Sequence, residues 1–303
     1  MRGMLVVVEK IILLLIKFFA LLPLSVLYVF SDGLCFMLHH LARYRREVVR
    51  QNLKNSFPEK SREELRQIEN GYYQHLADLF VEGIKLFHIS DEELKQRIEV
   101  IGGDLIEKLS ADGRSIVVFL GHYGNWEWVQ EVTKYYRRPA ISTEIYRHQH
   151  SRMASRLMTT MRSRFNTTPI EQKQALRTLL KMHQEGKQFL VGFIADQRPN
   201  SVNQNHFLTF LNQITAVPIG AEVIGTHIDA HFVYLEVSKI ARGHYRMEFK
   251  EMTPADTTTQ YPYTKLYMQL MEQTIRRKPE YWLWSHKRWS KWGKVNISPD
   301  NMI

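Results

Sequence analysis

The pattern of apolar and polar positions separates an apolar N-terminal segment from a longer body. Residues 11–30 read IILLLIKFFALLPLSVLYVF, and about 20 mostly apolar residues are enough for a helix to cross a bilayer. Lys17 and Pro23 interrupt this run, so interfacial or re-entrant helices and a buried hairpin stay open beside a single span. We expect residues 1–42 to form a membrane anchor or interfacial segment and residues 43–303 to form one domain.

The body alternates helical and strand patterns. A capping box, Ser61-Arg-Glu-Glu64, precedes a helix. The apolar stripe of that helix is expected to pack in the core, and it comprises Leu65, Ile68, Tyr72, Leu76, Leu79, Phe80 and Ile84. Continuous apolar runs suit strands buried on both faces, and the predicted strands cover residues 98–101, 115–120, 139–142, 188–195, 231–237 and 245–249. Helices alternating with buried strands predict an α/β fold.

Charge narrows the range of partners. The net charge is +10, which favours a polyanionic partner such as nucleic acid, an anionic membrane surface or an acidic protein. Basic residues gather directly after the apolar segment, at Arg43, Arg45, Arg46, Arg50 and Lys54. The positive-inside rule then puts the bulk of the chain in the cytoplasm. The single cysteine, Cys35, excludes an intrachain disulfide.

The clearest candidate for chemistry is Gly121-His-Tyr-Gly-Asn-Trp-Glu127, which directly follows a predicted buried strand. Sites in open α/β sheets lie at the carboxyl ends of strands. On a regular helix His122 and Glu127 would point apart, but they can meet if a loop precedes a helix that begins near Asn125. A histidine oriented by a carboxylate is a general base. A histidine that merely caps a strand–helix turn is the alternative.

Two further polar clusters follow predicted strands. Asp196-Gln197-Arg198 comes after residues 188–195, where Arg198 could hold a phosphate or an oxyanion. Asp196 could hydrogen-bond the acceptor or orient another side chain. Arg147, after Tyr146, is a candidate anion contact, and solvated loop charges are the alternative for each cluster. No familiar metal motif includes Glu127, so we expect no metal.

These blocks, taken in order, resemble the lipid A biosynthesis acyltransferases of the lauroyl- and myristoyl-transferase group, within the lysophospholipid acyltransferase superfamily. The resemblance spans nearly the full length. Its parts are an N-terminal anchor, Arg50-Gln-Asn-Leu53, the His-x₄-Glu block from His122 to Glu127, Tyr146-Arg147, Arg164, Asp196-Gln197, and Trp284-Ser-His286-Lys-Arg288-Trp289. The resemblance implies a mixed central sheet flanked by helices, as in glycerolipid acyltransferases, with an apolar membrane-anchoring helix before it.

The resemblance also implies the reaction. His122 would remove a proton from a lipid A precursor hydroxyl, Glu127 would orient His122, and the oxygen would attack an acyl-carrier-protein thioester. This donor is a co-substrate, and no cofactor is expected. The substrate-binding residues would be Asn125, Tyr146, Arg147, Arg164, Asp196, Gln197 and Arg198. The expected location is the bacterial inner (cytoplasmic) membrane, with the active domain on its cytoplasmic face.

Other functions remain open at this stage. A lysophospholipid or aminolipid O-acyltransferase would use the same chemistry on another acceptor. A catalytically silent membrane lipid-binding protein needs no His122–Glu127 pair, so the presence of both residues argues against it. The apolar N-terminal segment argues against a nucleic-acid binder.

Overall fold

The computed structural model describes all residues except 1, 147–166, 200–205 and 290–301, and for residues 2–11 it describes the backbone alone. Arg147 and Arg164 therefore lie outside the described residues. A seven-stranded sheet has the order β1-β9-β8-β2-β5-β3-β4. Its strands are β1 (Ile98–Ile101), β2 (Ile116–Leu120), β3 (Ile141–Tyr146), β4 (Thr167–Glu171), β5 (Phe189–Ile194), β8 (His231–Ala241) and β9 (His244–Glu251).

The sheet is mixed, as predicted. β8 and β9 pair antiparallel, and the remaining neighbours pair parallel, so β1 and β9 run against the other strands. A short antiparallel hairpin, β6 (Phe207–Phe210) with β7 (Gln213–Ala216), lies outside this sheet.

Apolar side chains of the central strand β2 alternate between two cores. Val117 and Phe119 belong to one core cluster, and Ile116, Val118 and Leu120 belong to the other. A strand with packing on both faces has no solvated side, which explains its uninterrupted apolar sequence.

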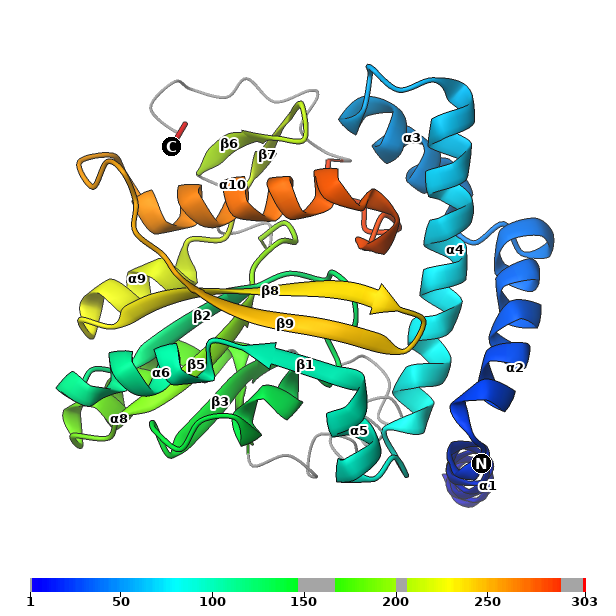
Figure 1. Cartoon of the computed structure of the whole chain (residues 1–303), viewed down its shortest axis with the longest axis horizontal. Coiled ribbons are helices and arrows are strands. Elements are labelled where there is room, and N and C mark those ends of the chain that lie inside the picture. The colour runs from blue at the N-terminus through cyan, green and yellow to red at the C-terminus, as the bar shows by residue number, and fades with distance from the viewer. Residues whose placement is uncertain (1, 147–166, 200–205, 290–301) are drawn as a thin grey trace.

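Helices flank the sheet (Figure 1). They are α1 (Arg2–Leu21), α2 (Leu24–Phe36), α3 (Arg46–Ser56), α4 (Arg62–Lys85), α5 (Asp91–Arg97), α6 (Gly103–Leu109), α8 (Ala175–Gln184), α9 (Gly220–His227) and α10 (Pro262–Arg277). Shorter helical segments are η1 (Met37–Leu41, π-helical) and the 3₁₀ turns η2 (Ser110–Asp112), η3 (Trp128–Lys134), η4 (Gln172–Gln174) and η5 (Pro279–Tyr281).

The N-terminal apolar run is two helices instead of one continuous span. α1 ends before Pro23, because proline cannot continue the hydrogen-bond ladder of a helix, and α2 begins after it. By length and composition alone, Leu24–Leu41 is long and apolar enough to cross a membrane. In Figure 1, however, α2 lies alongside α4, which borders the sheet.

α4 begins at the predicted capping box, in which Ser61 Oγ accepts from the backbone N–H of Glu64 and the Glu64 side chain accepts from that of Ser61. The prediction that its apolar stripe packs in the core is only partly correct. Tyr72 is buried, but Phe80 is 62% exposed. The most buried side of α4 instead includes the polar side chains His75, Asp78 and Glu82, whose partners come from segments distant in sequence.

Candidate active site

The candidate site lies where β2 and β5 end side by side. The two strands pair in parallel up to Leu120 and Ile194, so the residues after each strand emerge at the same edge. Gly121 follows β2 under tight packing, since a Cβ there would come within 2.5 Å of Met271 Sδ. This topology brings His122 of one loop to Asp196 of the other across 74 positions of sequence.

His122 and Asp196 form a histidine–carboxylate pair. Nδ1 of His122 lies 2.7 Å from Oδ1 of Asp196. Burial raises the pKa of Asp196, but His122, the Trp282 indole and Arg288 together lower it further, to about 2. Asp196 is therefore an anion that can only accept, so Nδ1 carries a proton, and in the neutral imidazole the lone pair is on Nε2. The His122 side chain is 21% exposed, which leaves it accessible to a substrate.

Both carboxylate oxygens and the backbone carbonyl oxygen of Asp196 have hydrogen-bond partners. Asp196 is 1% exposed, its Oδ2 accepts a 2.7 Å hydrogen bond from Trp282 Nε1, and its carbonyl oxygen accepts one from Arg288. The sequence left open whether Asp196 binds the acceptor or orients another side chain. In the structure its Oδ1 contacts the His122 imidazole, which fits the second of these two roles.

Glu127 occupies a different place. It stands directly before η3, and its Oε1 accepts a 3.2 Å hydrogen bond from Trp126 Nε1. The carboxylate that contacts Nδ1 of His122 is that of Asp196, and the orienting role of Glu127 stays a prediction. The spacing of the His-x₄-Glu block could not show this, because the neighbour of β2 in the sheet decides which carboxylate reaches the imidazole.

The buried side chain of Asn125 holds the loop after His122 through two hydrogen bonds. Its Oδ1 accepts from the backbone N–H of Trp128 at 3.1 Å, as expected of a capping residue, and its Nδ2 donates to Glu82 Oε2 at 2.7 Å. At 1% exposure, its amide faces the interior, whereas the sequence suggested contact with substrate. The helix expected to begin near Asn125 is the 3₁₀ segment η3, which begins at Trp128.

The segment after α10 completes the site, and its contacts were not predicted. Trp282 and Arg288 hold Asp196, and Asn52 Nδ2 donates to the carbonyl oxygens of Trp284 and His286 at 2.8 and 3.0 Å. The Arg50-Gln-Asn-Leu53 block and the C-terminal block thus meet in space. Burial, with Arg288 and His122, lowers the pKa of His286 to about 4 against the opposing effect of Asp196, so this second imidazole is neutral at pH 7.

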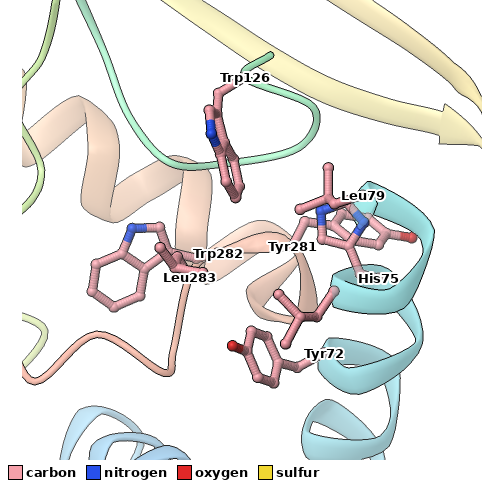
Figure 2. Close-up of a pocket in the computed structure, with 8 residues that line it drawn as sticks. Tyr72, His75, Leu79, Trp126, Tyr281, Trp282 and Leu283 are labelled. Carbon is pink, nitrogen blue, oxygen red and sulfur yellow. The ribbon is translucent and has the colours of Figure 1, made fainter. Parts of the chain in front are cut away.

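Figure 2 shows a small pocket with a mainly apolar lining. It is lined by Tyr72, His75, Leu76, Leu79, Trp126, Tyr281, Trp282 and Leu283. The ring centroids of Trp126 and His122 are 5.3 Å apart, and Trp282 binds Asp196. The pocket therefore abuts both members of the pair, but its empty volume of about 150 Å³ is smaller than the roughly 300–1,000 Å³ of ordinary ligand pockets.

The other predicted residues that the structure describes lie at the same edge of the sheet. Tyr146 ends β3, the neighbour of β5, and Gln197 and Arg198 follow Asp196. Tyr146 and both residues after Asp196 are partly exposed. Among the described residues, no group of three or more His, Cys, Asp or Glu side chains could hold a metal ion.

Comparison with known proteins identifies the family. The model of the bacterial lipid A biosynthesis acyltransferases matches residues 5–291. The solved 1-acyl-sn-glycerophosphate (LPA) acyltransferase PlsC from Thermotoga maritima is 12% identical, with 84% of this chain and 96% of that chain covered and a TM-score of 0.38. No curated protein matches the sequence. On the strength of the nearly full-length family match, the chain belongs to the bacterial lipid A biosynthesis acyltransferase family.

Proposed function

We propose that this lipid acyltransferase moves a fatty acyl group from an acyl-carrier-protein thioester to a hydroxyl of a lipid A precursor or a related glycolipid. The observation that carries the proposal is the His122–Asp196 pair, in which Nδ1 of the partly exposed His122 faces the carboxylate and Nε2 is the nitrogen left to act as a base. The family match supports the lipid substrate class.

The pair supports a direct transfer. Nε2 of His122 takes the proton of the acceptor hydroxyl as its oxygen attacks the thioester carbonyl carbon. The new C–O bond forms, the C–S bond breaks, and the imidazolium returns its proton to the leaving thiolate. Asp196, 2.7 Å from Nδ1, stabilises the imidazolium between these steps. The acceptor hydroxyl is the nucleophile, so no covalent acyl-enzyme is required.

Charge supports the choice of partners. A net charge of +10 suits both the acidic acyl carrier protein and the phosphates of a lipid A precursor. Arg198 follows the catalytic carboxylate by two positions, where a guanidinium can hold a phosphate. Arg147 and Arg164 remain proposed anion contacts. A lysophospholipid or aminolipid acceptor would keep the same chemistry and change only these contacts.

The direct test is transfer by the purified full chain. We expect acyl transfer from a labelled acyl-carrier-protein thioester to a lipid A precursor, and a loss of about 10²–10⁴-fold in His122→Ala, the range for removal of a general base. Transfer to a lysophospholipid alone would change the acceptor and keep the mechanism. Equal activity of wild type and His122→Ala would refute the mechanism.

We also propose that the enzyme sits on the cytoplasmic face of the inner membrane, with α2 in the interface and not across it. The outward side of α2 and η1 is apolar at helical spacing: Val26, Val29, Phe30, Phe36 and Met37 are exposed. The inward side is tied to the body by hydrogen bonds from Ser31 to Asp78 and from Tyr28 to Glu82. Exposed Arg43 and Arg45 follow, suited to anionic headgroups.

Flotation with vesicles containing anionic lipid tests this placement. We expect the full chain to float and Val29→Glu/Phe30→Glu to float at least about tenfold less, because each apolar side chain contributes roughly 1.5–3 kcal/mol when buried. Leu176→Glu is a matched control, since Leu176 is an exposed leucine on α8, at the opposite end of the molecule from α2 (Figure 1). Protection of an N-terminal tag from external protease inside sealed vesicles would instead show a spanning helix.

A further inference from the structure

One side of α4 carries three polar residues that are almost fully buried. His75, Asp78 and Glu82 are spaced by three and four positions, which puts them on one side of the helix, and none is more than 2% exposed. We call these three residues the α4 polar face. A buried polar side chain is costly unless it is hydrogen-bonded, so the partners of this face show what it holds in place.

Glu82 gathers three side-chain donors from three parts of the chain. Its Oε1 accepts from Tyr28 of α2 at 2.8 Å. Its Oε2 accepts from Tyr245 of β9 at 2.8 Å and from Asn125 of the loop that carries His122 at 2.7 Å. The Glu82 carbonyl oxygen also accepts from Trp128 Nε1 at 3.3 Å. Two of these four contacts, those from Asn125 and Trp128, hold residues that follow His122 closely in the chain.

His75, about two turns before Glu82 on α4, holds the same loop. Lys239 Nζ, a donor, lies 3.4 Å from its Nδ1, so Nε2 carries the ring proton and donates to the carbonyl oxygen of Gly124 at 3.3 Å. Burial, with Lys239 second, lowers the pKa of His75 to about 3, which keeps the ring neutral. Gly124 adopts a positive φ of 58°, a conformation that suits glycine.

We propose that Glu82 is a positioning residue for acyl transfer, which fixes the loop between β2 and η3 through Asn125 and thereby sets the place of His122. The inference rests on the proposed function. His122 lies two residues beyond the last residue of β2. From there to η3 the loop belongs to no strand, and in the described part of the chain its one β-bridge joins Tyr123 to Trp282. Asp196 holds the start of the loop through His122, and Glu82 holds its end through Asn125. Displacement of a base by about 1 Å can cost about 10²-fold in rate.

The donor and the acceptor of the Glu82–Asn125 bond can be exchanged. Asn125→Asp sets two carboxylates against each other and keeps the Oδ1 cap on Trp128. Glu82→Gln/Asn125→Asp restores a bond in the reverse direction, from the new amide to the new carboxylate. The second hydrogen of that amide then faces Tyr245, whose hydroxyl oxygen accepts from it instead of donating. We expect Asn125→Asp to lower kcat about 10- to 100-fold with KM within about threefold, and the double variant to recover to within about threefold of wild type.

Hydrogen exchange of the 121–128 peptide provides a readout that does not need activity. We expect Asn125→Asp to raise the exchange rate of this peptide at least about tenfold and the double variant to return it to the wild-type rate. Tyr28→Phe is the matched control, since it removes a bond to Oε1 of the same carboxylate and leaves the Asn125 bond. Its kcat should stay within about twofold of wild type.

The two readouts separate failure of the inference from failure of the proposed function. If wild type transfers no acyl group to any acceptor lipid, the proposed function fails, and exchange still tests the loop contact. If Asn125→Asp loses activity with unchanged exchange, or the double variant recovers neither readout, Glu82 does not position the loop. An effect of Tyr28→Phe equal to that of Asn125→Asp would also overturn the inference, because the carboxylate would then act through α2.

Discussion

Replacement of Asp196 by asparagine is expected to lower kcat for acyl transfer by about 10²–10⁴-fold with little change in fold. Trp282 Nε1 donates to Oδ2 of Asp196, so the oxygen of an asparagine amide would face Trp282 and its NH₂ group would face His122. Nδ1 would then have to accept, and the proton would move to Nε2. The imidazole would keep its position and lose the lone pair that takes the hydroxyl proton. Steady-state kinetics at pH 7 measure the loss.

Two comparisons sharpen this result. In Asp196→Asn/Trp282→Phe the indole donor is gone, so the amide can turn and present its oxygen to His122. We expect this double variant to recover at least about tenfold relative to Asp196→Asn. Glu127→Gln tests the rival carboxylate. A loss of 10²-fold or more in Glu127→Gln, together with an Asp196→Asn variant within threefold of wild type, would return the orienting role to Glu127.

The sequence predicted where the candidate residues of the site lie better than it predicted their contacts. The buried strand before His122 and the polar residues after the next buried strand were both evident from pattern. The pairing of His122 with Asp196 depends on β2 lying next to β5. The spacing of residues within one motif does not show which strands are neighbours in the sheet. Trp282 and Arg288 approach Asp196 from about 90 positions away, and no periodicity relates such distant residues.

The general class of the fold was also predicted better than its individual elements. A mixed sheet flanked by helices was expected and is present, whereas β4 and the β6–β7 hairpin were not predicted. In β4, Pro169 weakens the strand pattern. The apolar stripe of α4 suggested its buried side, and Tyr72 of that stripe is buried, but the α4 polar face is buried as well. Helical periodicity reports where apolar residues lie and is silent on buried charges whose partners come from elsewhere.

Loss of Asp78 is expected to have the largest effect on stability. The Asp78 carboxylate accepts from Ser31 of α2, and it pairs with Lys239 and Arg242 of the β8–β9 hairpin. The Lys239 side chain is only 8% exposed, so Asp78→Ala leaves a buried ammonium without its carboxylate. Breaking a buried pair in this way costs about 3–5 kcal/mol. Urea unfolding of the detergent-solubilised chain measures the change.

The charge left behind, more than the lost bond, causes this cost. Asp78→Ala/Lys239→Met removes that charge and should therefore be more stable than Asp78→Ala alone, by about 1–3 kcal/mol. Asp32→Ala is the matched control, because Asp32 pairs with the same Arg242 and its side chain is 57% exposed. Exposed pairs contribute about 0–1 kcal/mol. Equal losses in Asp78→Ala and Asp32→Ala would mean that solvent reaches Lys239. The contacts of Asp78 with α2 and with the β8–β9 hairpin would then contribute far less to stability than their burial indicates.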